Sequence, residues 1–241
     1  MKDFKGMEQY KTHYLKPEVQ QEICSFCLMR EAAVIAPGWM HEEGAFQNGQ
    51  RNLRIHEPYM VKKIHTFKLD KSETPVQWYY SLATYSNGLP FKNFLIPTQQ
   101  KTFWIINHWK SMVAYDFCMD IDAPSFEYKD LALKDAQKIA KDLLSFMRRV
   151  EIRDSGKGFH IIVAYEDLPK HLQQCSFNPY HENNIYTEFK KIALRYYETH
   201  SEMIDTSIYD SRRVVKTPGS LAIYEEDIVE CKILEVLENV G

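Results

Sequence analysis

The stretch "YDFCMDIDAP", residues 115–124, places several carboxylates in what reads as a buried strand. Side chains alternate between the two faces of a strand. One face then carries the apolar series Tyr115, Phe117, Met119 and Ile121, and the other carries Asp116, Cys118, Asp120 and Asp122. Like charges that lose water on one face need compensation, for which a bound cation is the usual source. The pattern therefore indicates a cation site.

Asp120 and Asp122 form a D-x-D pair at the end of this strand. Two carboxylates on one face can bridge a pair of divalent ions about 3.5–4 Å apart, which is the geometry of polymerases, nucleases and phosphatases. Mg²⁺ and Mn²⁺ prefer such oxygen ligands. D-x-D also occurs at ordinary strand ends. The apolar residues on either side of this pair are what strengthen the prediction of a metal site.

A second candidate lies in "DSGKGFHIIV", residues 154–163. Gly156 and Gly158 let backbone amides approach a ligand, and Ser155, Lys157 and His160 supply hydrogen-bond donors and charge. The alternative is a glycine turn that joins a helix to a strand, with His160 as a hydrogen-bonded core residue. The stretch does not match the full phosphate loop G-x-x-x-x-G-K-[ST].

A third candidate is "IDTSIYDSRRVVKTPGSL", residues 204–221. Asp205 can add a third carboxylate to a metal site, and Arg213 and Lys216 can counter a polyphosphate. An exposed charged hairpin explains the same residues. The order of all three stretches in one chain is harder to explain without a shared site.

These three stretches, in this order, resemble the archaeo-eukaryotic primase superfamily, and most of all the small catalytic subunit of archaeal DNA primases. That family carries a "FDIDA"-like first motif, an "S-G-x-x-G-x-H" second motif and a third region that ends in "R-L-I-R-L-P-G-S-L". The segments "REAAVI" (30–35), "RNLRI" (51–55) and "WYYSLATYS" (78–86) are also similar to it. The resemblance spans about residues 20 to 222.

The resemblance implies roles for nine residues. Asp120, Asp122 and Asp205 are expected to hold the metal ions and to be catalytic, and the expected nucleotide-binding residues are Ser155, Gly156, Lys157, His160, Arg213 and Lys216. Asp205 is preferred to Asp210 as the third ligand because it lies 13 residues before Pro218, close to the family's interval.

The chain departs from the archaeal pattern in three places. The turn "SGKGFH" is one residue shorter, so that Asp154 or Ser155 can occupy the place of the family's serine. Ala222 follows "PGSL" where archaeal chains often have histidine, and the cysteine-rich zinc module after D-x-D is missing. A compact or divergent member, or a piece of a longer chain, fits these differences.

The function implied is that of a DNA-directed primase, which makes short RNA or DNA primers on a template by nucleotidyl transfer with two Mg²⁺ or Mn²⁺ ions. The expected partners are a single-stranded DNA template, nucleoside triphosphates and a large regulatory primase subunit. Three alternatives stay open: a primase-polymerase that only extends primers, a metal-dependent nuclease, and a degenerate subunit that only binds nucleic acid.

The elements that must position these residues follow from periodicity. We expect helices over 7–30 (broken near Pro17), 57–68, 132–150 and 185–196, and strands over 32–35, 52–55, 76–86, 115–122 and 160–165. Residues 212–224 read as strand, turn and strand. The pattern favours an α/β (α+β) fold, a mixed-sheet primase-polymerase core with flanking helices. We expect one catalytic domain over 1–241, in which the parts of about 1–110 and 111–241 form one unit.

Composition places further limits. The 241 residues carry a net charge of −3 and are 44% hydrophobic, so a phosphate-binding surface must be a local basic patch, for which 134–157 is the candidate. No apolar run is long enough for a membrane span or a signal peptide. Five cysteines without a framework spacing fit a reducing compartment. We expect an intracellular protein, cytoplasmic and nucleoid-associated, or nuclear in a eukaryote.

Cys24 and Cys27 form a lone C-x-x-C pair. A structural zinc site requires more ligands, and the nearest candidates, His171, Cys175 and His181, are far away in the sequence. Two cysteines on one buried helix face are the favoured interpretation.

Overall fold

A computed structural model of the chain describes residues 6–35, 50–53, 61–62, 66–69, 72–86, 108–224 and 227–239. The chain forms two compact units. The first contains Met1–Ser81, Asn87–Ile96 and Val214–Lys232, and the second contains Leu82–Ser86, Pro97–Arg213 and Ile233–Gly241. That the parts of the chain act together as one catalytic domain stays a prediction.

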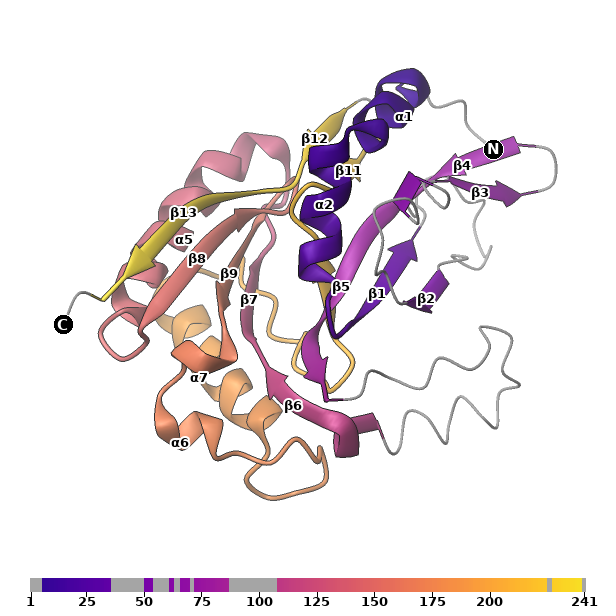
Figure 1. The fold of residues 1–241 in the computed structure, drawn as a ribbon. Coiled ribbons are helices and arrows are strands. Elements are labelled where there is room, and N and C mark those ends of the chain that lie inside the picture. The colour runs from indigo at the N-terminus through magenta and orange to yellow at the C-terminus, as the bar shows by residue number, and fades with distance from the viewer. Residues whose placement is uncertain are drawn as a thin grey trace. The chain divides into compact units, whose positions relative to one another are not determined.

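The first unit begins with two helices, α1 (Met7–Leu15) and α2 (Pro17–Phe26), in which Pro17 occupies the first turn of α2. Its main sheet has the order β10-β5-β1-β2; β5, β1 and β2 are labelled in Figure 1. The strands are β1 (Arg30–Ile35), β2 (Gln50–Leu53), β5 (Gln77–Tyr85, whose end belongs to the second unit) and β10 (Val214–Lys216). Two smaller pairs join β3 (Thr66–Leu69) to β4 (Ser72–Pro75) and β11 (Leu221–Ile223) to β12 (Ile228–Glu230).

The second unit is built on a sheet of order β13-β8-β9-β7 (Figure 1). Its strands are β7 (Phe117–Ile121), β8 (Arg149–Asp154), β9 (Phe159–Val163) and β13 (Lys232–Glu238). The helices are α5 (Lys129–Leu143), which packs on β8 and β9, α6 (Lys170–Gln173) and α7 (Ile185–Thr199). Strand β6 (Met112–Tyr115) pairs with the end of β5, and short 3-10 turns cover His108–Ser111, Phe126–Tyr128 and Tyr165–Asp167.

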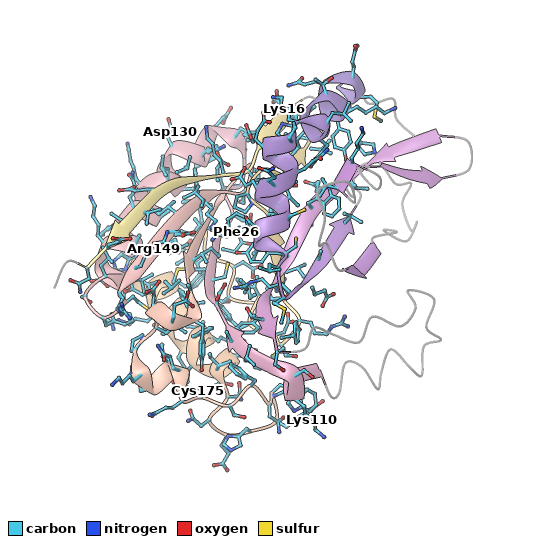
Figure 2. The ribbon with its side chains drawn as sticks, viewed as in Figure 1. Lys16, Phe26, Lys110, Asp130, Arg149 and Cys175 are labelled. Carbon is cyan, nitrogen blue, oxygen red and sulfur yellow. The ribbon has the colours of Figure 1, made fainter. Side chains whose placement is uncertain are left out.

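The single strand predicted from residue 115 is divided at Asp116, because β6 ends at Tyr115 and β7 begins at Phe117. Within β7 the predicted alternation of faces is confirmed. Phe117, Met119 and Ile121 are fully buried, and the Phe117 ring meets that of Phe189 on α7 edge to face at 5.0 Å. Helices therefore cover this face of the sheet, and the opposite face of β7 carries Cys118 and Asp120. Arg149 at the start of β8 is labelled in Figure 2; its guanidinium pairs with Glu151 at 2.7 Å.

The mixed α/β class is confirmed, and every strand pairing with a described register is antiparallel. The helices near 7–30 and 185–196 and the strands near 32–35, 76–86 and 160–165 are also confirmed. Residues 212–224 do contain two strands, but they pair with other partners: β10 with β5, and β11 with β12.

The predicted helix over 132–150 is wrong at its end, because α5 stops at Leu143 and β8 begins at Arg149. Val150 continues the apolar spacing of the helix but is a buried strand residue. Next to it Glu151 accepts a hydrogen bond from Nε of Arg153 at 2.9 Å, and both side chains are buried. Helical spacing at this one position therefore does not distinguish a helix from a strand.

The predicted helix over 57–68 lies mostly outside the described residues. Within it, Val61 and Lys62 are helical, and Thr66–Leu69 is strand β3. Of the predicted strand over 52–55, Asn52 and Leu53 belong to β2 and the rest is outside the described residues. No helix in the described part of the chain has both the length and the apolar character needed to cross a membrane.

Candidate metal and nucleotide site

Three carboxylates from distant parts of the chain meet at the end of β7. Ile204 forms an antiparallel bridge with Ile121. The amide of Asp205 donates to the Asp120 carbonyl oxygen at 2.8 Å, and the amide of Asp122 donates to the Met203 carbonyl oxygen at 2.9 Å. Residues 203–205 thus add a short strand beside β7. Opposed residues of antiparallel strands share a face, so Asp205 lies on the face of Asp120.

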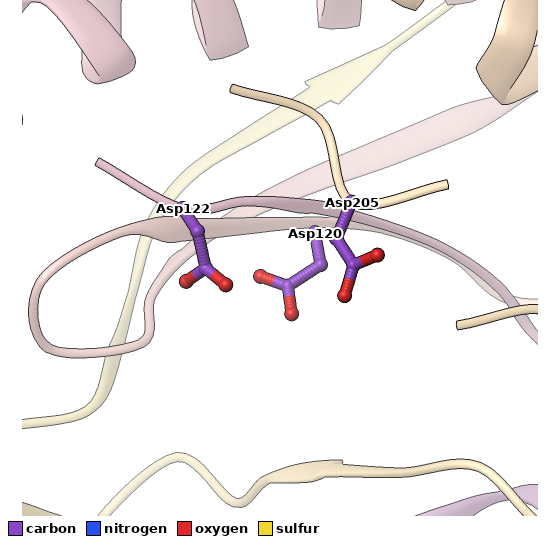
Figure 3. A group of neighbouring side chains, drawn as sticks. All are labelled: Asp120, Asp122 and Asp205. Carbon is purple, nitrogen blue, oxygen red and sulfur yellow. The ribbon is translucent and has the colours of Figure 1, made fainter. Parts of the chain in front are cut away.

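The triad is compact and accessible. One carboxylate oxygen from each of Asp120, Asp122 and Asp205 lies within 4.8 Å of the other two. Figure 3 shows the three carboxylates projecting from the same side of the strand. Asp122 is exposed and the other two are half-buried. Each ionised pair at such a distance repels by roughly 1–4 kcal/mol near a protein surface, and a divalent cation would reverse this repulsion.

The donor set fits Mg²⁺ or Mn²⁺, which take carboxylate oxygens and keep water or phosphate oxygens in their remaining positions. Partial exposure leaves such positions open to a ligand. Among the described residues, this is also the single group of three or more His, Cys, Asp or Glu side chains close enough to share one ion.

His160 belongs to the same row of residues. On β9 it stands opposite Asp120 of β7 on one side and opposite Arg153 of β8 on the other. Its Nε2 lies 3.5 Å from Oδ1 of Asp120, and the ring is buried. The sheet therefore aligns Arg153, His160, Asp120 and Asp205 across four adjacent segments on one face.

The stretch 155–158 is the turn of the β8–β9 hairpin, and it does not join a helix to a strand. The amide of Ser155 donates to the Gly158 carbonyl oxygen at 3.0 Å, and Gly156 has a φ of 112°. A Cβ at Gly158 would overlap the carbonyl oxygen of Ile121 and lie 3.2 Å from Cα of Asp122. The absence of a side chain at Gly158 thus lets the turn lie against the D-x-D pair. Ser155 is buried and Lys157 is half-buried.

Asp210 does not join the triad, which supports the choice of Asp205. Its Oδ1 accepts from the amide of Arg212 at 2.8 Å, and its Oδ2 accepts from Nη2 of Arg213 at 3.0 Å. Nε of Arg213 donates to the Ile208 carbonyl oxygen at 2.9 Å. Arg213 therefore closes the loop 205–213 on itself, and its expected role in binding phosphate stays a prediction.

No place at the site was predicted from the sequence for Tyr209, which lies in this loop. Its hydroxyl oxygen is buried and has no hydrogen-bond partner among the described residues. Burial, followed by the nearby charges of Cys118, Asp120 and Asp205, raises the pKa of Tyr209 well above its usual value. A buried hydroxyl without a partner is costly, and in the sequence Tyr209 is one of many tyrosines.

Lys216 lies on β10, in the first unit, where its backbone pairs with that of Tyr79. The turn that follows, 217–220, also belongs to the first unit. The role expected for Lys216 stays a prediction.

The cysteines of the C-x-x-C pair lie at the end of α2. Cys27 is buried and burial raises the pKa of its thiol, while Cys24 is half-buried. Cys175 donates from Sγ to the His171 carbonyl oxygen and to the Asn183 side chain. Cys27 is thus buried but follows the last residue of α2, and Cys24 is not fully buried, so the pair departs from the expected buried helix face.

No protein-family model matches the sequence, and no curated protein matches it. Among solved structures, the polymerase domain of ligase D from Mycobacterium tuberculosis, in a complex with DNA, is similar with a TM-score of 0.48 and 11% sequence identity. The alignment covers 89% of this chain and 76% of that one. A likeness of this degree does not extend to function.

Proposed function

We propose that the chain is a metal-dependent nucleotidyltransferase of the primase-polymerase type, and that it makes short primers on a single-stranded DNA template. One observation carries this proposal: Asp120, Asp122 and Asp205 gather within 4.8 Å beside the turn 155–158. A nuclease would need the triad but not a basic turn beside it. The order of these motifs, which resembles that of archaeal primases, supports the same function.

In this proposal Asp120, Asp122 and Asp205 would hold two Mg²⁺ or Mn²⁺ ions, and the chemistry that such ions supply when bound would be neutralisation of phosphate charge and activation of a 3′-hydroxyl. The turn 155–158 binds the triphosphate through the side chains of Ser155 and Lys157, and Gly156 sets their direction, since the amides of Ser155 and Gly156 already donate within the hairpin. His160, next to Asp120, contacts the phosphate chain from the adjacent strand. Positioning and electrostatics supply the rate enhancement, as in other phosphoryl transfers.

Arg213 and Lys216 are proposed as further phosphate-binding cations. Arg213 would have to exchange its contact with Asp210, which is half-exposed and therefore weak. Template contacts would come from basic side chains with little sequence readout. A large regulatory subunit is a proposed partner.

The test is synthesis on a single-stranded DNA template with nucleoside triphosphates, Mg²⁺ or Mn²⁺ and no primer. Wild type should give labelled oligonucleotides, and Asp120→Asn should lose at least about 10³-fold in rate, since one metal ligand and one charge are removed. Asp130→Asn, an exposed position on α5 (Figure 2), is the control and should retain activity.

Three results decide the proposal. Equal product from wild type and Asp120→Asn contradicts it. Extension of a supplied primer without unprimed synthesis points to the extending primase-polymerase. Template binding without any synthesis in either metal supports a non-catalytic subunit.

A further inference from the structure

One side chain links the segment after the D-x-D pair to the turn 155–158. Lys129, the first residue of α5, donates from Nζ to Oδ2 of Asp154 at 2.8 Å and to the Gly156 carbonyl oxygen at 2.7 Å. The other carboxylate oxygen of Asp154, Oδ1, accepts from the amide of Gly156 at 2.8 Å. Lys129 and Asp154 together hold both backbone polar groups of Gly156.

Gly156 is the residue whose conformation sets the course of the turn. Its φ of 112° lies in a region that L side chains rarely adopt. Ser155 and Lys157, the proposed phosphate-binding residues, stand on either side of it. The direction of both side chains therefore depends on how Gly156 is held.

The surroundings make the Lys129–Asp154 pair stronger than an exposed ion pair. The side chain of Lys129 is 24% exposed and that of Asp154 is 10% exposed. Nζ of Lys129 also lies 5.6 Å from the centroid of the Phe159 ring. Reduced contact with water strengthens the attraction. The lysine also neutralises a carboxylate that would otherwise repel an anion bound at this turn.

We propose that Lys129 is a positioning residue for the triphosphate. It holds Gly156 and neutralises Asp154, so that the turn 155–158 presents Ser155 and Lys157 to phosphate without direct contact between Lys129 and the nucleotide. This inference rests on the proposed function of the turn. The competing possibility is that Lys129 leaves Asp154 and binds phosphate itself.

The first experiment needs no ligand. Amide hydrogen exchange is measured in Lys129→Met and in Lys190→Met, which removes the same charge at an exposed position of α7. Amides of 155–158 should exchange about tenfold faster in Lys129→Met and at the wild-type rate in Lys190→Met. Equal exchange in the two variants overturns the proposal.

The second experiment measures the affinity for Mn²⁺–ATP by calorimetry. Lys129→Met should weaken binding about tenfold, the effect of one charge-assisted hydrogen bond, and Lys190→Met should not weaken it. The same pair of measurements is made in an Asp154→Asn background. If Lys129 acts through Asp154, its replacement should have a much smaller effect there. A tenfold loss in both backgrounds, together with wild-type exchange of the amides of 155–158 in Lys129→Met, means direct contact with phosphate and overturns the proposal.

Steady-state kinetics supply a third readout. A positioning role predicts that Lys129→Met raises KM for the nucleotide with little change in kcat, whereas general destabilisation would lower the active fraction and leave KM unchanged. Wild-type protein that binds no nucleotide would contradict the proposed function instead. The exchange measurement would still decide whether Lys129 orders the turn.

Discussion

The turn 155–158 in the second unit and the turn 217–220 in the first are both short, contain glycine and follow charged strands. Their surroundings differ. In the first unit Ser220 and Thr217 are fully buried, and Nε2 of His13 donates to the Gly219 carbonyl oxygen at 2.8 Å. In the second, Lys157 is half-buried and Gly158 lies against the backbone of Ile121 and Asp122. The turn 217–220 therefore anchors a helix, whereas the turn 155–158 can receive a ligand.

The hydrogen bonds of the turn 217–220 explain its role. The hydroxyl oxygen of Ser220 accepts from the Trp78 amide at 2.8 Å, and the Leu221 amide donates to the hydroxyl oxygen of Tyr14 at 2.9 Å. The Cys231 amide donates to the Ser220 carbonyl oxygen at 2.7 Å. "PGSL" thus joins α1, β5 and β12 within one unit. A motif that looks functional in the sequence has a structural explanation here.

Among the substitutions that test the difference between the two turns, Gly158→Ala should have the largest effect on stability. Because the new Cβ would overlap the backbone oxygen of Ile121, β7 and the turn must move apart, at a cost of about 3 kcal/mol in the free energy of unfolding. Gly219→Ala should cost about 1 kcal/mol, since its Cβ meets only the end of the Glu22 side chain and the cost comes from its φ of 80°. Urea denaturation measures both. The reverse ranking would mean that the turn 155–158 tolerates displacement.

Ser220→Ala should be next in size. It leaves the buried Trp78 amide without its acceptor, so the free energy of unfolding should fall by about 2 kcal/mol. The exposed Ser145→Ala variant is the control and should stay within about 0.5 kcal/mol of wild type. Mn²⁺ affinity should be unchanged in both. A loss of Mn²⁺ affinity in Ser220→Ala would mean that the turn 217–220 also contributes to ligand binding, and that its role is not structural alone.

Tyr209→Phe should stabilise the ligand-free protein by about 1 kcal/mol, because it removes a buried hydroxyl that lacks a partner. Tyr196→Phe is the matched control: its hydroxyl donates to Oδ2 of Asp142 at 2.6 Å, so its loss should destabilise by about 1 kcal/mol. Thermal unfolding of the two variants should shift in opposite directions. Destabilisation by Tyr209→Phe would show that its hydroxyl is hydrogen-bonded in solution.

The smallest effect concerns Glu22, which faces the turn 217–220. Burial, followed by the charge of Glu230, raises the pKa of Glu22, while His13 lowers it. A raised pKa means that the folded state holds the proton more tightly, so this contribution to stability is present at low pH and is lost as the pH rises through the folded-state pKa. Glu22→Gln should therefore gain a few tenths of a kcal/mol relative to wild type between about pH 4 and 7. Urea denaturation across that pH range measures the free energies of unfolding of Glu22→Gln and wild type, with Glu18→Gln as the control. If the advantage of Glu22→Gln over wild type shrinks as the pH rises, the prediction is contradicted.

The sequence predicts those parts of the site that depend on local order. Strand alternation places Asp120 and Asp122 on one face, and the interval before Pro218 favours Asp205 over Asp210, as the geometry of the triad does. Strand β8 was missed because Val150 fits the helical spacing of Leu143 and Met147. That Glu151 and Arg153 can be buried depends on their ion pair, which an isolated sequence does not show.

Two residues at the site have no signal in the sequence at all. The contact of Lys129 with Gly156 depends on a hairpin that was not predicted, and the unpartnered hydroxyl of Tyr209 depends on how its loop folds. Both are properties of tertiary packing and not of spacing. The turn 217–220 differs, because the family resemblance did identify this segment in the sequence. The burial of its residues, which the sequence does not show, indicates a structural role.

The short strand 203–205 joins β7 through one antiparallel bridge. So few contacts make this segment a candidate for opening by itself, while the sheet stays intact. Such opening would dismantle the ion-binding centre by withdrawing one carboxylate. By mass action, a cation that binds only the closed form slows the fraying of this segment in proportion to its occupancy. Titration with Mn²⁺ should then protect the amide of Asp205, and it should raise the free energies of local opening and of global unfolding by the same amount.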